Sequence, residues 1–145
     1  MVEQLSVFLA NEPGRLARLC RLLGDAGLNM HALVVADTAD YGVVRVICDR
    51  PYTARGVLER DGFAVSVTRV IAAEVPDRPG GLADMLELLD SGGVNVEYLY
   101  CFLKPDSSTA VDVLRVEDAE KASALLTGAG ISLLHASEVY QPDAV

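Results

Sequence analysis

The chain has 145 residues, of which 51% are hydrophobic, and its formal net charge is −9. This length allows one domain or two small ones. The negative charge argues against binding to nucleic acid, which needs clustered lysine and arginine side chains. No apolar run reaches the roughly 18 residues that cross a bilayer, and the first residues lack the basic region of a signal peptide. We therefore expect a cytoplasmic protein with neither a membrane nor a nucleic acid as its partner.

The three cysteines, Cys20, Cys48 and Cys101, lie far apart inside apolar runs. Without a Cys-x-x-Cys pair they predict neither a disulfide framework nor a zinc site. Buried cysteine commonly behaves as a small hydrophobic side chain, and we expect that role here. The sequence therefore predicts no metal site and no cofactor.

A short turn motif, Asx-x-Pro-Gly-x-Leu, occurs at residues 11–16 and again 66 residues later at 77–82. Each copy follows an apolar run and precedes a helical pattern. We expect the helix to begin at the proline, whose ring fixes φ and whose missing N–H would be unpaired in the first turn anyway. The next glycine lets another molecule approach the backbone, and the free amides of a first turn suit a carboxylate.

The helices after the two turns share one apolar stripe with the i, i+3, i+4, i+7 spacing of an amphipathic helix. The stripe consists of Leu16, Leu19, Cys20 and Leu23 in the first copy and of Leu82, Met85, Leu86 and Leu89 in the second. A second helix in each copy carries Ala54, Val57 and Leu58, or Ala122, Leu125 and Leu126, at an offset of 68 residues. We place the two extra residues of the second copy in the loop at 104–108.

Strand patterns surround these helices in the same order in both copies. We expect strands at 5–10, 28–36, 41–48 and 63–67 in the first copy, and at 69–75, 94–103, 110–116 and 131–135 in the second. The order βαββαβ with right-handed crossovers predicts an α+β, ferredoxin-like unit, a four-stranded antiparallel sheet with both helices on one face. The predicted domains are therefore residues 1–67 and 68–145, with an extra C-terminal strand at about 136–140.

The repeated turn, the amphipathic helix and the helix stops Ala26-Gly27-Leu28-Asn29-Met30 and Gly92-Gly93-Val94-Asn95-Val96 together resemble the ACT domain. The resemblance covers nearly the whole chain, twice. It implies a free-standing tandem of small regulatory modules that bind amino acids. It also implies that two units pair into a continuous eight-stranded antiparallel sheet, with ligands at the seam, the line where one unit's turn meets the second strand of its neighbour.

Carried over by motif, the resemblance assigns sixteen residues to ligand binding. The turns contribute Asn11, Glu12, Gly14, Arg15 and Leu16, and Asp77, Arg78, Gly80, Gly81 and Leu82; the second strands contribute Asn29, Met30 and His31, and Asn95, Val96 and Glu97. The chemistry fits an α-amino acid: helix-terminal amides receive its carboxylate, a side-chain oxygen receives its ammonium, and apolar residues bound its side chain.

Simpler roles exist for the same residues. Asn11 and Asp77 are good helix caps, and Asn29 and Asn95 suit a helix-to-strand turn. His31 is more simply an ordinary strand residue. The copies also differ, because Arg15, Asn11 and His31 align with Gly81, Asp77 and Glu97, so the two sites are expected to differ in affinity or use.

The sequence gives no recognisable nucleophile–base pair, and we expect a non-catalytic regulatory protein, a homodimer that binds a small amino acid. One alternative is a regulatory subunit or interaction module for a separate biosynthetic enzyme, such as acetolactate synthase or an aspartate kinase. A less favoured alternative is a small phosphatase of ferredoxin-like fold, because Arg15 stands where such enzymes hold phosphate. Its counterpart in the second copy is Gly81, and the glycine-rich phosphate loop is missing.

Overall fold

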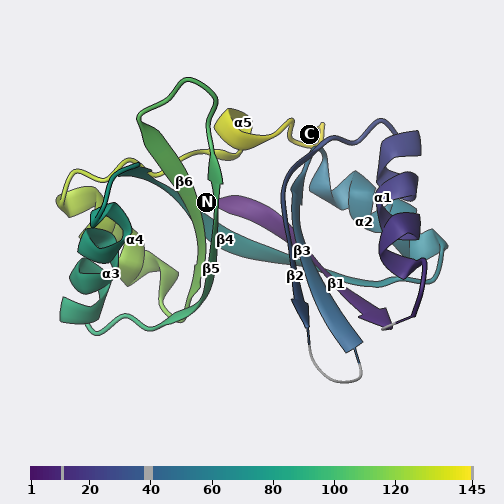
Figure 1. Cartoon of the computed structure of the whole chain (residues 1–145), viewed down its shortest axis with the longest axis horizontal. Helices are drawn as coiled ribbons and strands as arrows, with labels where there is room; N and C mark the ends of the chain where they lie inside the picture. Colours follow the sequence, from purple (N-terminus) through teal and green to yellow (C-terminus); the bar gives the residue numbers. More distant parts are fainter. Residues whose placement is uncertain (11, 38–40, 145) are drawn as a thin grey trace. The chain divides into compact units, whose positions relative to one another are not determined.

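A computed structural model describes residues 1–10, 12–37 and 41–144 of the chain. The fold is α+β, with an antiparallel sheet of six described strands in the order β2-β3-β1-β4-β6-β5 (Figure 1). The strands are β1 (Val2–Ala10), β2 (Met30–Asp37), β3 (Tyr41–Cys48), β4 (Ala64–Pro76), β5 (Val96–Leu103) and β6 (Thr109–Val116). The helices are α1 (Arg15–Asp25), α2 (Pro51–Arg60), α3 (Gly81–Ser91), α4 (Ala119–Gly128) and α5 (Ala136–Val139).

The predicted sheet of eight strands is wrong for two reasons. The fourth strand of the first copy and the first strand of the second form one continuous strand, β4, because no turn residue interrupts the apolar run between them. The predicted strand at 131–135 is reduced to a single bridge between Ala73 and Leu133. The remaining elements appear in the predicted order.

The chain divides into two compact units. The first unit consists of residues 3–68 and 136–145, and the second of residues 1–2 and 69–135. The division into residues 1–67 and 68–145 that the repeat suggests stays a prediction. The tail, residues 136–145, groups with the first half of the chain.

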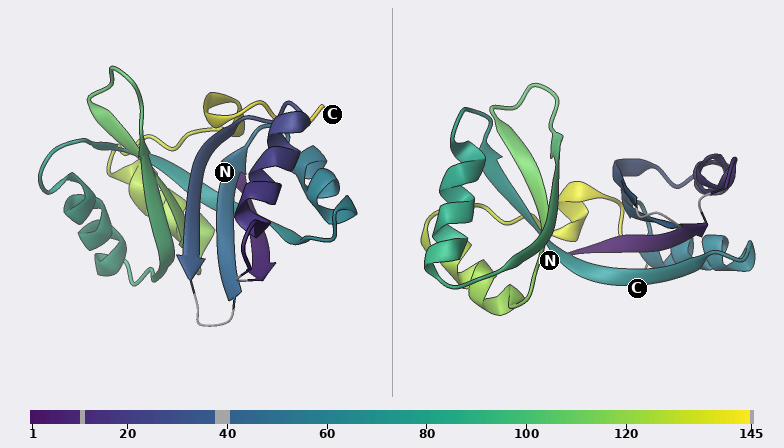
Figure 2. Two further views of the ribbon diagram at one scale, coloured as in Figure 1. Left: turned by 45° about the vertical axis from the view of Figure 1, so that its right-hand side comes forward. Right: turned by 60° about the horizontal axis from the view of Figure 1, so that its bottom comes forward.

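In the first unit, α1 and α2 lie side by side (Figure 2) over the strands β1, β2 and β3. The stripe on α1 supplies Leu19 and Leu23, which are fully buried, and α2 supplies Ala54 and Leu58. All four join one hydrophobic core with the inner residues of the strands. Leu16 belongs to the same stripe but is 38% exposed, which leaves an apolar side chain at the start of α1.

The second unit repeats this packing with different residues. Met85 and Leu89 from α3 and Ala122 and Leu126 from α4 form its buried core with β4 and β6. Leu82, the counterpart of Leu16, is likewise 38% exposed. The sequence therefore predicted the buried part of each stripe, which depends only on the helical period, but not the exposure of its first leucine.

The predicted strand at 136–140 is wrong, because residues 136–139 form α5. The amide of Tyr140 donates to the carbonyl of Ala136 at 2.9 Å, the i to i−4 bond of a helical turn. The Tyr140 ring is buried, and its hydroxyl accepts from the amide of Glu3 at 3.0 Å. The tail is thus held by a side chain rather than by strand pairing. Within the described ranges, every helix is too short or too polar to cross a bilayer.

Candidate ligand-binding site

The two repeated turns end at a glycine in the left-handed region. Gly14 has φ 86° and Gly80 has φ 85°, and they are the N-caps of α1 and α3. The helices therefore begin at Arg15 and Gly81, two residues later than the prolines at which the sequence predicted them to begin. Only glycine adopts this φ at little cost, so the glycine of the motif is required by the turn itself.

Neither helix start is capped by a side chain among the residues that the structure describes. The expected capping role of Asp77 is therefore not observed, and its amide donates instead to the carbonyl of Ser108 at 2.9 Å. Asn11 lies outside the described residues. Backbone amides of a first helical turn have no partner within the helix, so both starts offer donors to an anion.

A hollow of about 260 Å³ lies beside the turn of the first unit. Leu9, Val35 and Leu16 form apolar parts of its lining, and Glu12 and Arg15 add charge. The guanidinium carbon of Arg15 lies 4.3 Å from the centroid of the Phe63 ring, a cation–π contact that holds the side chain beside the helix start. This place combines a cation, uncapped amides and an apolar wall.

The second unit has a different arrangement at the same turn. Gly81 is buried, and a Cβ built on it would lie 2.2 Å from the carbonyl oxygen of Pro76, so α3 starts tightly against the end of β4. Arg78 supplies the nearby cation, with its Nη2 2.8 Å from Asp84 Oδ2 and its Nη1 donating to the carbonyl of Pro79 at 3.0 Å. A hollow of about 340 Å³ lies along α3, toward Met85 and Ile131.

The residues predicted on the second strands do not meet the turn of their own unit. In the first unit Ala10 pairs with Tyr41 and Asp37 pairs with Gly42, so the turn is level with the end of β2. Met30 pairs with Cys48 at the other end of β3. Seven residues of strand separate the two levels by roughly 23 Å. Asn29 and His31, at the start of β2, therefore reach a turn only if it belongs to a neighbouring unit.

His31 and its neighbours take part in a different contact. Asp49 Oδ1 lies 2.8 Å from His31 Nε2 and accepts from the amide of Gln141 at 2.8 Å, while its Oδ2 accepts from the amide of Asn29 at 3.3 Å. Burial favours the neutral form of Asp49, but these hydrogen bonds outweigh it and lower the pKa of its carboxyl. The role that this carboxylate has in the fold was not predicted, because its partners are far away in the sequence.

The corresponding residues of the second unit make a different contact. Asn95 is exposed, Val96 is half-buried, and Glu97 Oε2 lies 3.5 Å from Arg115 Nε. A polar hollow of about 490 Å³ adjoins Asn95 and the start of α4. There Asp118 caps the helix, because its Oδ1 accepts from the amide of Lys121 at 3.1 Å.

The tail supplies the matching cap in the first unit. The N-cap of α2 is Arg50, at φ 43°, and its own side chain makes no capping bond. Asp143 accepts instead, from the amides of Tyr52 and Thr53 at 2.9 Å each and from Thr53 Oγ1 at 2.7 Å. The tail therefore occupies in the first unit a helix start that the second unit caps with its own residue.

The two second strands, β2 and β5, are the end strands of the six-stranded sheet. Both carry exposed apolar side chains: Leu33 is 39% and Val35 44% exposed on β2, and Leu103 is 66% exposed on β5. Exposed, apolar end strands are surfaces on which another chain pairs readily. Within the ranges that the structure describes, no three histidine, cysteine, aspartate or glutamate side chains gather as a metal site.

Comparisons with known proteins agree with this fold. The family model described as ACT domain pair matches residues 1–140, so the resemblance noted in the sequence is confirmed. A crystal structure of a protein from Bacteroides thetaiotaomicron is 36% identical, with a TM-score of 0.89, covering 95% of this chain and 94% of that one. No curated protein sequence matches the chain.

More distant structures share the fold alone. The ligand-free regulatory subunit of aspartate kinase from Thermus thermophilus is 18% identical, with a TM-score of 0.66, and the match covers 88% of this chain and 90% of that subunit. Aspartate kinase from Synechocystis is 16% identical, with a TM-score of 0.60; the match covers 88% of this chain but 24% of the kinase.

Proposed function

The chain belongs to the ACT domain pair family, and from that premise we propose that it is a non-catalytic regulatory protein that binds a small amino acid at its repeated turns. The observation that carries this proposal is the pair of helix starts at which no described side chain acts as a cap. Each has a hollow beside it, of about 260 Å³ in the first unit and 340 Å³ in the second.

The chemistry of the turns suits a zwitterion. The amides of the first helical turn donate hydrogen bonds to the carboxylate of an amino acid, and Arg15 or Arg78 adds a positive charge nearby. The ammonium group requires an oxygen acceptor, and the turns offer Asn11 or Asp77. Apolar residues such as Leu16 and Leu82, each 38% exposed, supply a surface for the ligand's side chain.

A second copy of the chain completes each site in this proposal. The turn is level with the end of its own second strand, whereas residues 29–31 lie at the start of that strand. If the exposed end strands of two chains pair antiparallel, the start of one strand lies beside the end of the other. Asn29, Met30 and His31 of one chain, or Asn95, Val96 and Glu97, then face the turn of its partner. A homodimer would thus bring together the two groups of residues that a single unit separates.

Ligand binding would regulate by favouring one arrangement of the chains over another. The direct test is a thermal-shift screen of the twenty L-amino acids at millimolar concentration, because a saturating ligand adds roughly 1–3 kcal/mol to the free energy of unfolding. At least one amino acid should raise the melting temperature. The absence of any shift, together with no heat of binding, would contradict the proposal.

The regulated target is a second question. The similarity to an aspartate kinase regulatory subunit favours a role as a partner of a separate biosynthetic enzyme, such as an aspartate kinase or acetolactate synthase. Size-exclusion chromatography of this protein with the purified enzyme of its own organism tests that role. Co-elution that changes on addition of the bound amino acid would support it, and separate elution at micromolar concentration would contradict it.

A further inference from the structure

Asp112, in the middle of β6, is a buried carboxylate whose hydrogen bonding is incomplete among the described residues. Its side chain belongs to a residue that is 2% exposed, and its Oδ2 has no hydrogen-bond partner among the described residues. Burial raises the pKa of this carboxyl. A buried polar group that lacks a partner costs stability, so its presence in a well-packed core calls for a functional explanation.

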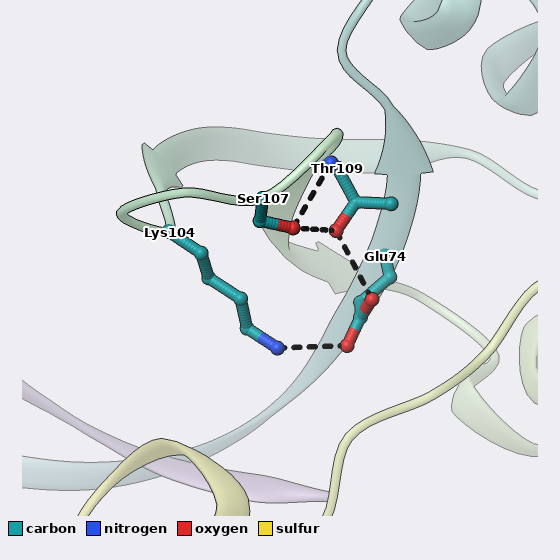
Figure 3. A network of polar contacts seen from close by, with 4 residues as sticks. All are labelled: Glu74, Lys104, Ser107 and Thr109. Atoms are coloured by element: carbon teal, nitrogen blue, oxygen red, sulfur yellow. Dashed lines mark hydrogen bonds and ion pairs between the residues drawn. The ribbon is translucent and has the colours of Figure 1, made fainter.

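The other carboxylate close to this part of the sheet has its partners. Glu74 Oε1 accepts from Lys104 Nζ at 2.8 Å, and its Oε2 accepts from Thr109 Oγ1 at 3.1 Å, as Figure 3 shows. Ser107 extends this network through a 2.9 Å contact with Thr109 Oγ1. These bonds lower the pKa of Glu74, chiefly through the bond from Lys104. Among the described residues, Asp112 is therefore the carboxylate of this region that keeps an oxygen without a hydrogen-bond partner.

The strand register places Asp112 on the helix-facing side of the sheet. Ala110 and Leu114, two residues away in each direction, belong to the core beneath α3 and α4. Directly opposite Asp112 lie Ala73 on β4 and Cys101 on β5. Both are small, and Cys101 is exposed on the end strand. The carboxylate is thus one strand away from the open end of the sheet.

In the first unit an apolar residue occupies the position that corresponds to Asp112. There Val44 is the counterpart of Asp112, because it pairs with Val7 and Val35 as Asp112 pairs with Ala73 and Cys101. Val35 lines the hollow beside the turn of the first unit. Its counterpart Cys101 therefore marks the corresponding place in the second unit, and directly opposite strand residues have their Cβ atoms about 4.5–5.5 Å apart.

We propose that Asp112 is the counter-charge for the ammonium group of the amino acid that binds at the second unit. This inference rests on the proposed function and assigns a specific acceptor within it. The carboxylate of the ligand lies at the start of α3, and its ammonium binds the Asp112 carboxylate from the side of β5, where Cys101 is the residue opposite Asp112. A charge-assisted bond that is shielded from water is stronger than one to an exposed Asp77.

The two units then have different ligand preferences. The second unit selects molecules with a protonated amine, whereas the first unit, with Val44 in place of the carboxylate, lacks this selection. An amino acid therefore binds the second unit more tightly. Carboxylic acids of the same shape without the amine lose that advantage.

The test compares wild type with Asp112→Val, which restores the residue of the first unit, and with Asp112→Asn. The probes are the twenty L-amino acids and, for the best binder, the matched carboxylic acid that lacks the amine. Both variants should weaken binding of that amino acid by about tenfold to a hundredfold, and their affinity for the amine-free acid should stay that of wild type. The control is Glu74→Gln, a carboxylate in the same unit with its own partners, which should retain full affinity.

Stability in the absence of ligand provides a second readout. Asp112→Val should raise the denaturant midpoint, because it removes an unpaired buried carboxylate, whereas a purely structural aspartate would lower it when replaced. Equal affinity of wild type and both variants for an amino acid would overturn this inference and leave the proposed function intact. Binding of none of the twenty by wild type would overturn both.

Discussion

Arg15 and Gly81 occupy the same position in the two copies of the repeat, but their surroundings differ. The Arg15 guanidinium lies over the Phe63 ring, whereas Gly81 has no room for a side chain against the carbonyl of Pro76. The two copies of the motif thus share one backbone conformation, with Gly14 and Gly80 at nearly equal φ. They differ in the charged side chain that lies beside the turn. The two helix starts are not interchangeable sites.

Replacing Gly81 by alanine should destabilise the second unit. The new Cβ would lie 2.2 Å from the Pro76 carbonyl oxygen, a backbone atom that moves only with the end of β4. We expect a loss of about 1–3 kcal/mol in the free energy of unfolding, measured in urea. Gly24→Ala is the matched control in α1, where nothing lies within 4 Å, and it should stabilise by about 0.5–1 kcal/mol. Equal effects of the two variants would contradict the close contact at Gly81.

Replacing Arg15 by alanine removes the cation over Phe63. We expect a loss of about 0.5–1 kcal/mol of stability and weaker amino acid binding at the first unit. Arg21→Ala serves as the control, because its side chain is 73% exposed and its ion pair with Asp25 contributes little. Urea unfolding and calorimetric titration provide the two readouts. Identical affinity in wild type and Arg15→Ala would exclude Arg15 from the site.

Replacing Asp143 by alanine should release the start of α2. Its carboxylate accepts from two backbone amides and from one hydroxyl, so we expect a cost of about 1 kcal/mol or more, comparable with removal of the Asp118 cap from α4. Asp90→Ala, an exposed position on α3, is the control and should be nearly neutral. If Asp143→Ala were as neutral as that control, the tail would not be docked on the first unit.

Acid should destabilise the first unit through Asp49 and Asp143. Burial opposes the ionised form of each, but hydrogen bonds, from Gln141 to Asp49 and from Thr53 to Asp143, lower the pKa of both carboxyls. The unfolded chain then binds protons more readily than the native one, so this stability is present above the ordinary aspartate pKa of about 3.9 and is lost as the pH falls below it. Urea midpoints between pH 7 and pH 3 should fall more steeply in wild type than in Asp143→Ala. Parallel curves would contradict the assignment.

Pairing of two chains through their end strands can be tested by introducing one charged residue on β2. Val35→Lys places a cation at a residue that is 44% exposed on β2, so we expect the fold to persist and the dimer to dissociate. Light scattering after size exclusion should give twice the 15.4 kDa chain mass for wild type and a single chain mass for the variant. Ala124→Lys, exposed on α4, is the control that should remain dimeric. A wild type that is monomeric at micromolar concentration would contradict the proposed completion of the sites.

Much of this fold could be predicted because its signals are local. The stripe through Leu19 and Leu23 and its repeat through Met85 and Leu89 follow the helical period, and both were found buried. The glycines of the turns were recognised by their spacing, and their left-handed φ explains it. The helix starts were misplaced by two residues, because the turn continues through the proline before the helix begins.

The features that were missed depend on residues far apart in the sequence. The tail forms α5 and docks through Tyr140 and Asp143, whose partners lie near the start of the chain and on α2. Asp112 lies in a strand with apolar residues on both faces, so alternation alone did not reveal which face it occupies. The predicted strand at 131–135 is reduced to one bridge, in which Leu133 pairs with Ala73 of β4.

Isothermal titration calorimetry with the twenty L-amino acids tests most directly whether the starts of α1 and α3 bind a small amino acid. We expect saturable binding of at least one of them, with its affinity reduced in Asp112→Val and unchanged in Glu74→Gln. If none of the twenty gave heat of binding at millimolar concentration, the chain would be an ACT domain pair without an amino acid ligand.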